Sequence, residues 1–214
     1  MTEYALSMRR DSLARGLEAM ASMEKGKPYA LRPEDAKRRL ADELARLCSE
    51  AGVKPVVIGG LAVNHHGYMR VTADVDILVS RQEVVPLYRR LRDEPGWKRH
   101  AEGFKNTLVG VGLDVCVEGE RTSPGSREEF PNPAELAKVA VRPLPVPALS
   151  ELIALKVMSG RARDDADVVE LLKRHRSRMG ALRSAASKRL RTAEARNRLR
   201  ALVGRAREEA ARRR

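Results

Sequence analysis

The residues that decide the fold run from 55 to 79 and read PVVIGGLAVNHHGYMRVTADVDILV. The apolar run 55–58 predicts a short buried strand that ends at Gly59-Gly60, and residues 61–67 then fit a short helix. Residues 73–79 predict a second strand, in which acidic and apolar side chains alternate. This order of strand, glycine turn, helix and strand is typical of an α/β protein.

Three aspartates give this stretch its chemistry. Asp74 and Asp76 are separated by one residue of a strand, so both side chains leave the same face. Two such carboxylates repel each other unless a cation lies between them, and Mg²⁺ prefers oxygen ligands of this kind. A third acid, Asp114, stands in the apolar segment 113–117, where an unpaired charge would be costly. If the two strands pair, the three acids converge.

Each of these features also has a simple structural explanation. The two acids could lie on a solvated strand face, the glycine pair could form a plain turn, and Asp114 could pair with an arginine. The combination is more specific than its parts, and it favours a metal site. Gly59-Gly60 would also let the backbone approach a phosphate at the start of the short helix.

The rest of the chain adds helices and short strands. A helix is expected after Pro33 with Gly52 at its C-terminal cap, and Ser80 with Glu83 forms a capping box before another helix. Further predicted elements are strands at 97–100, 107–109 and 113–117, a loop at 120–135, an extended segment at 142–147, and helices at 149–158 and 164–174.

The net charge of the chain is concentrated at its C-terminus. Residues 173–214 hold 16 of the 42 Lys and Arg residues but only 3 of the 29 acidic ones, which accounts for the whole formal charge of +13. A surface so one-sided repels itself unless a polyanion or an acidic partner compensates. We expect this basic tail to bind RNA, ahead of an acidic protein and of a lipid surface.

Composition excludes several classes of protein. The sequence contains no apolar run approaching the roughly 20 residues that a membrane span requires, and charged residues interrupt the first 25 positions where a signal peptide would be apolar. Two cysteines, Cys48 and Cys116, fit buried thiols in a reducing compartment, so the cytoplasm is expected. Seven aromatic residues are too few for a base-stacking platform.

Beyond these features, the sequence resembles a family. Gly59-Gly60-Leu61-Ala62-Val63, then His66-Gly67, Arg70, Thr72 and Asp74-Val75-Asp76, resemble the signature of DNA polymerase β-like nucleotidyltransferases. The segment from Leu152 to Lys156, followed by Gly160-Arg161, Arg163-Asp164 and Asp167-Val168, is similar to the small bacterial branch with AbiEii-type proteins and the MenT toxins. The resemblance spans about residues 55–172.

The resemblance implies a role for each matching residue. Asp74, Asp76 and Asp114 would bind metal, two Mg²⁺ ions with Mn²⁺ as the alternative, and Asp114 would also help to activate the acceptor hydroxyl. The residues around the nucleotide triphosphate would be Gly59, Gly60, Arg70, Thr72, Lys156, Asp164 and Asp167.

Three points about these residues stay open. The pattern does not choose between Asp164 and Asp167. Arg70 either contacts a phosphate or pairs with a nearby acid, and Lys156 either reaches the phosphates or extends over the edge of the core. Many relatives have Gly-Ser where this chain has Gly59-Gly60, which removes a hydroxyl from the phosphate site.

These observations predict an α/β nucleotidyltransferase fold, a small mixed sheet flanked by helices, with a helical C-terminal extension. The expected parts are an N-terminal arm (1–32), a catalytic core (33–147), a helical pair completing the nucleotide site (148–176) and a basic helical tail (177–214). The expected enzyme transfers a nucleoside monophosphate from an NTP to RNA, with the 3′ end of tRNA as the specific candidate.

A toxin-like role with a cognate antitoxin follows from the resemblance alone. Alternative acceptors are a protein or a small molecule such as an aminoglycoside. A different class of alternative is an inactive nucleotidyltransferase-like module that binds RNA or a partner protein. No membrane partner is expected.

Overall fold

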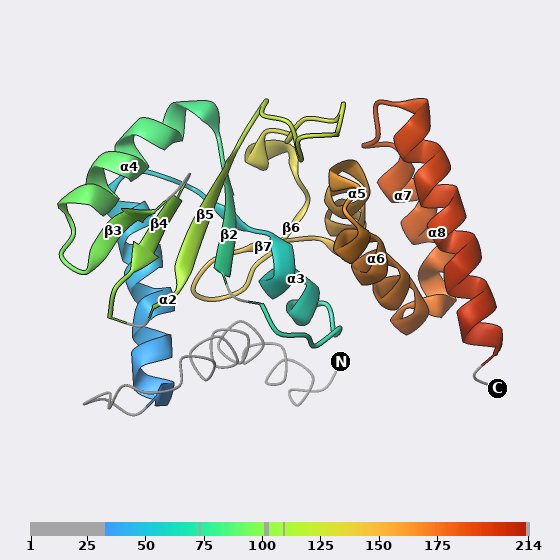
Figure 1. Ribbon diagram of the computed structural model, residues 1–214, viewed down its shortest axis with the longest axis horizontal. Coiled ribbons are helices and arrows are strands. Elements are labelled where there is room, and N and C mark those ends of the chain that lie inside the picture. The colour runs from blue at the N-terminus through green and yellow to red at the C-terminus, as the bar shows by residue number, and fades with distance from the viewer. Residues whose placement is uncertain (1–32, 73, 101–102, 109, 213–214) are drawn as a thin grey trace.

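The computed structural model describes residues 33–72, 74–100, 103–108 and 110–212, so the expected N-terminal arm lies outside the described residues. Its centre is a five-stranded mixed sheet in the order β1-β2-β5-β4-β3 (Figure 1). The strands are β1 (Val56–Val57), β2 (Asp74–Val79), β3 (Trp97–His100), β4 (Gly103–Asn106) and β5 (Gly112–Val117). A separate two-stranded ribbon pairs β6 (Lys138–Val139) with β7 (Val146–Pro147).

The parallel pairing of β2 with β5 brings two distant segments together, whereas the other neighbouring strands pair antiparallel. Because β2 and β5 lie inside the sheet, most of their apolar side chains are buried, and Val115 and Cys116 are partly buried. Val75 and Leu113 face a layer that includes Leu40 and Leu44 of α2 (Pro33–Glu50). The acidic side chains leave the opposite face, as the alternating pattern predicts.

Helices cover both sides of this sheet and extend beyond it (Figure 1). The helix α4 (Val84–Asp93) packs with α2 and β3, and α3 (Gly59–His65) packs on β2. Next come α5 (Leu149–Ser159) and α6 (Ala162–Arg174), and then α7 (Met179–Ser187) and α8 (Ala193–Ala211) on their far side. The expected mixed sheet, flanking helices and helical C-terminal extension are confirmed.

The two C-terminal helices pack closely against the helical pair before them. Their apolar stripes are buried, and α7 packs on α5 while α8 packs on α6. The buried side chains are Leu182, Ala186, Leu190, Leu199, Leu202, Val203 and Ala206. Burial of a Leu or Val side chain contributes roughly 1.5–3 kcal/mol. The basic segment therefore has an apolar inner face and a charged outer face.

The strand predicted at 107–109 was wrong at residues 107 and 108, because the chain turns there, and residue 109 lies outside the described residues. The strand before β5 is β4, and Leu108 after it is 66% exposed. The Asn106 side chain accepts a hydrogen bond from the Leu108 N–H at 3.0 Å, and its carbonyl accepts one from Gly110. An asparagine bonded to its own backbone in this way favours a turn over a strand.

No helix in the described part of the chain is long and apolar enough to cross a membrane.

Two glycines give a matched test of this backbone. Gly204 lies inside α8 and Gly52 follows α2, and a Cβ added at either would meet nothing within 4 Å. Gly52 has a φ of +69°, whereas Gly204 is helical. We expect Gly204→Ala to raise the free energy of unfolding by roughly 0.5–1 kcal/mol, since glycine disfavours helix interiors.

Gly52→Ala should instead lower the free energy of unfolding by about 1–2 kcal/mol, since a residue with a Cβ is strained at positive φ. Urea titration of both variants checks the pair. Equal effects in the two variants would contradict the assigned backbone conformations.

Candidate active site

The three predicted acids lie on the two parallel strands in the middle of the sheet. In the β2–β5 register Asp76 stands opposite Asp114, and Asp74 stands opposite Gly112. Neighbouring strands lie about 4.8 Å apart, so the side chains of Asp76 and Asp114 leave one face side by side. Asp74 follows on the same face, one pleat away. The expected strand pairing is confirmed.

Two glycines make room for these carboxylates. Gly59 has a φ of +61°, and a Cβ on it would lie 1.9 Å from Oδ2 of Asp76. A Cβ on Gly112 would lie 2.3 Å from Oδ1 of Asp74. Any larger residue at position 59 or 112 would displace an acid, so close packing requires both glycines, and the positive φ is a second reason for glycine at position 59.

The electrostatics of the acids are unfavourable without a counterion. Burial, and after it the charge of Asp114, raises the pKa of Asp76 to about 6, against the opposing effects of Lys156 and Arg161. Within the described residues, no three His, Cys, Asp or Glu side chains are grouped closely enough to hold a metal ion. The ionised carboxylate of Asp76 is therefore destabilised, and a bound cation would stabilise it.

A cleft of about 670 Å³ opens beside Asp76 and Asp114. One wall is the sheet with Gly59, and the facing wall comes from α5 and the turn after it. The residues that line this facing wall are Leu152, Leu155, Lys156, Ser159, Arg161 and Asp164, and the loop 120–124 borders the cleft. Acids on one wall thus face cations on the other.

A buried chain of ion pairs supports the facing wall. Arg70 binds Asp167 with two hydrogen bonds of 2.6 and 2.8 Å. Lys156 lies 2.6 Å from Asp164 and 2.9 Å from Asp167, and Arg161 lies 2.7 Å from Asp164. Positive and negative groups alternate along these five residues. The inner pairs are compensated, as buried ions must be, and the three cations and two acids leave a net charge of +1 with the exposed Arg161 at one end.

The C-terminal helix α8 fixes the turn between α5 and α6. Arg198 lies 2.8 Å from both Asp165 carboxylate oxygens and donates to the carbonyl of Gly160, a residue with a φ of +67°. Arg161, the next residue, has a side chain that is 66% exposed. A residue of the basic tail thus holds the turn that carries Arg161, one of the exposed cations that line the cleft.

Cysteine chemistry is disfavoured in this cleft. Cys116 lies on β5 among the lining residues. Burial, followed by the charges of Asp76 and Asp114, raises the pKa of its thiol to about 12. The thiolate is the nucleophilic form, so Cys116 is unreactive at neutral pH.

The predicted nucleotide-binding residues fall into two layers. Gly59, Lys156 and Asp164 line the cleft. The other four, Gly60, Arg70, Thr72 and Asp167, are not among the residues that line the cleft. Arg70 pairs with Asp167, and a Cβ on Gly60 would lie 2.5 Å from Oγ1 of the buried Thr72. Of the two alternatives for Arg70, pairing with an acid is the one observed. Contact of these residues with a nucleotide stays a prediction.

Sequence reasoning missed three features of the site. Arg161 was recognised only as part of a motif, Gly112 was not singled out, and the segment Arg121, Thr122 and Ser123 was treated as plain loop. An arginine directly after the helix-ending Gly160 was the available signal for the first. A glycine two residues before the strand acid Asp114 was the signal for the second.

Comparison with known proteins gives a fold-level likeness. No protein-family model matches the sequence, and no curated protein matches it. Among solved structures, the chain is similar to a crystal structure of ANT(2″)-Ia in complex with adenylyl-2″-tobramycin, with a TM-score of 0.45 and 13% identity over 72% of this chain and 98% of the other. A solution structure of the antibiotic-resistance factor ANT(2″)-Ia gives a TM-score of 0.44 and 13% identity over 72% and 93%.

At this degree of similarity, function has to be inferred from the site geometry. The AbiEii and MenT branch, with its toxin and antitoxin roles, stays a hypothesis.

Asp76→Asn should make the protein more stable and unable to respond to Mg²⁺. At about pH 8 without divalent ions the variant should melt higher, because an amide carries no charge to bury. Burial raises the pKa of Asp76, so the wild type is at a disadvantage above about pH 6 and at none below about pH 4, where the carboxyl is protonated. The difference between variant and wild type should therefore shrink as the pH falls through that window.

Thermal melting with and without MgCl₂ across this pH range measures both effects. Asp93→Asn on α4, an exposed acid, is the control and should leave the Mg²⁺ response intact. A variant that melts lower at pH 8, or that keeps the Mg²⁺ response, would contradict the assignment.

Arg198→Ala should lower the urea midpoint clearly, because it removes three hydrogen bonds from the α5–α6 turn. Hydrogen bonds to charged groups contribute about 1.5–3 kcal/mol each, less here since the Arg198 side chain is 35% exposed. Arg191→Ala removes another tail arginine that pairs with an acid of the preceding chain, Glu129, through an exposed contact. This control should change the free energy of unfolding by at most about 1 kcal/mol. Equal losses would show that Arg198 has no special role.

Proposed function

We propose that this protein is a metal-dependent nucleotidyltransferase that moves a nucleoside monophosphate from an NTP to an acceptor hydroxyl. The observation that carries the proposal is the cleft of about 670 Å³, which Asp76 and Asp114 line together with Lys156 and Arg161. Asp76 and Asp114 would favour a bound cation, and the exposed Arg161 and Arg121 at the same cleft would suit an anion, so a substrate that carries both charges matches the site. A polyphosphate with its bound divalent ion is such a substrate.

Two neighbouring carboxylates can take part in binding a divalent ion, whereas no three acids of the described residues are grouped as a complete ligand set, so substrate oxygens would complete the coordination. Asp76 and Asp114 offer neighbouring carboxylate oxygens on one sheet face, and Asp74 stands one pleat away. The raised pKa of Asp76 reflects burial and the charge of Asp114, both of which a cation would offset. These three acids would hold Mg²⁺, two ions in the proposed arrangement with Mn²⁺ as the alternative. When bound, the metal would supply charge neutralisation to the triphosphate.

The chain's own residues would act on the two ends of the reaction. The acceptor hydroxyl oxygen forms a bond to the α-phosphorus while the bond from that phosphorus to the β-phosphate oxygen breaks. Asp114, an exposed carboxylate at the cleft, would accept the hydroxyl proton. Pyrophosphate leaves toward the cationic wall, where the exposed Arg161 is the available donor.

RNA is the acceptor that we favour, with the 3′ end of tRNA as the specific candidate. The charge of the 173–214 segment supports it, because the segment carries the whole +13 of the chain. The cleft supports a second acceptor, a cationic aminoglycoside: Asp76, Asp114, Glu120 and Asp164 all line it. An inactive module that only binds RNA is the alternative of a different class.

A transfer assay separates these alternatives. We expect the protein with MgCl₂ and one labelled NTP at a time to release pyrophosphate and to label total RNA. Aminoglycosides and total protein are tested in parallel. Asp114→Asn should reduce transfer at least about a hundredfold, since positioned proton transfer contributes 10²–10⁴-fold.

Asp93→Asn is the control and should transfer at the wild-type rate. Label on an aminoglycoside instead of RNA would change the acceptor and keep the reaction. If the folded, metal-loaded protein released no pyrophosphate with any NTP and acceptor, the transferase proposal would be rejected. The inactive RNA-binding module would then be the remaining alternative.

A further inference from the structure

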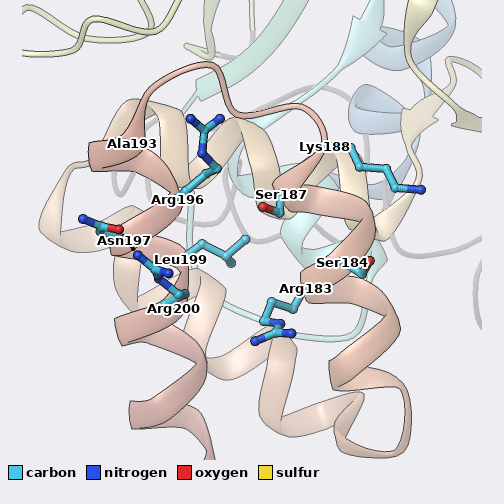
Figure 2. Close-up of a pocket in the computed structure, with 9 residues that line it drawn as sticks. All are labelled: Arg183, Ser184, Ser187, Lys188, Ala193, Arg196, Asn197, Leu199 and Arg200. Atoms are coloured by element: carbon cyan, nitrogen blue, oxygen red, sulfur yellow. Dashed lines mark hydrogen bonds between the residues drawn. The ribbon is translucent and has the colours of Figure 1, made fainter.

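The outer side of the C-terminal helices carries a groove of about 560 Å³ between α7 and α8. Figure 2 shows Arg183 of α7 and Arg196 and Arg200 of α8 around it, with Leu199 between the two helices. Lys188 at the end of α7 extends away from α8 (Figure 2). The remaining lining residues are Ser184, Ser187, Ala193 and Asn197.

The four cations of the groove have no acidic partner among the described residues, whereas part of the remaining tail charge is paired. Elsewhere in the tail, Arg189 pairs with Glu151, Arg191 with Glu129 and Arg198 with Asp165. By contrast, none of the groove-lining residues is acidic, and within the described part of the chain Arg183, Lys188, Arg196 and Arg200 have no acidic side chain within 4.0 Å. This unpaired charge calls for an anionic partner from outside.

The arrangement of the charges suits a chain of phosphates more than a single anion. Arg196 and Arg200 stand one turn apart on α8, a rise of about 6 Å, and Arg183 reaches in from the facing helix. None of the lining residues is aromatic, so bases have nothing to stack on. Cations without a stacking platform fit the backbone of base-paired RNA, which is recognised through phosphates and shape.

A second hollow adjoins the cleft and reaches the first turn of α8. It encloses about 300 Å³ and shares Ser123, Pro124, Ser159 and Arg161 with the cleft. The first turn of α8 borders both hollows, with Thr192 and Ala195 in this one and Ala193 and Arg196 in the groove. An RNA bound in the groove would reach the acids by passing the first turn of α8.

We propose that the α7–α8 groove binds the phosphate backbone of an RNA stem, whose single-stranded end enters the cleft. The second half of this statement rests on the proposed transferase function, whereas the first half does not. The two are therefore tested by different measurements.

The binding test compares two triple variants with the same loss of charge. The groove variant is Arg183→Gln, Arg196→Gln and Arg200→Gln, and the control is Arg176→Gln, Arg178→Gln and Arg212→Gln, three exposed tail arginines that do not line the groove. The probe is an RNA hairpin with a single-stranded 3′ end, titrated without NTP or metal over a range of salt. A poly-glutamate chain of equal charge is the second probe.

We expect the groove variant to bind the hairpin more than about tenfold weaker, with a salt slope flatter by about 2 to 3, since each lost phosphate contact contributes about 0.7–0.9. The control variant should lose much less. Equal losses in both variants, or no binding of RNA by the wild type, would overturn the proposal. Poly-glutamate bound as tightly as RNA would also overturn it and indicate an acidic protein partner.

Catalysis is measured separately on the same proteins. Groove-dependent binding without any label transfer would keep the groove and reject the transferase. If the groove variant labelled the hairpin as well as the wild type does, the transferase function would be retained and the role of the groove rejected.

Discussion

The parallel pairing of β2 with β5 sets two carboxylates beside each other, and much of the surrounding structure is arranged to tolerate this. Asp76 and Asp114 occupy facing positions of the register. Glycines at 59 and 112 provide the space for the acids of β2, and the cations Lys156 and Arg161 approach from the other side of the cleft. The pKa of Asp76 is raised because burial and the charge of Asp114 outweigh the opposing charges of Lys156 and Arg161. Strongly shifted pKa values are concentrated at functional sites, where a bound ligand can stabilise the unfavourable charge.

The facing wall depends on ion pairs that join segments far apart in the sequence. Asp167 connects Arg70, which lies before β2, to Lys156 on α5, and Asp164 connects Lys156 to Arg161. Breaking a buried pair costs more than the pair contributes, because one charge is left uncompensated. The site walls are thereby held in one relative position.

Local patterns were enough to predict most of the elements and the convergence of the acids. Alternation predicted β2 and β5, and the convergence of Asp74, Asp76 and Asp114 was predicted on the condition that these two strands pair, which they do. The sequence could not show that Lys156 is held by two aspartates, because its partners are chosen by helix packing. The Arg70–Asp167 pair, 97 positions apart, is beyond local patterns for the same reason. The turn at 107–108 was missed because the Asn106 side chain competes with strand pairing.

The position of Arg198 has a consequence for how the protein matures during synthesis. The strands, the acids and the chain of ion pairs are all encoded before residue 175, but the guanidinium that clamps the turn at Gly160 and Asp165 comes from α8. The turn between α5 and α6 can therefore gain its clamp only after α8 has been synthesised and has packed on α6.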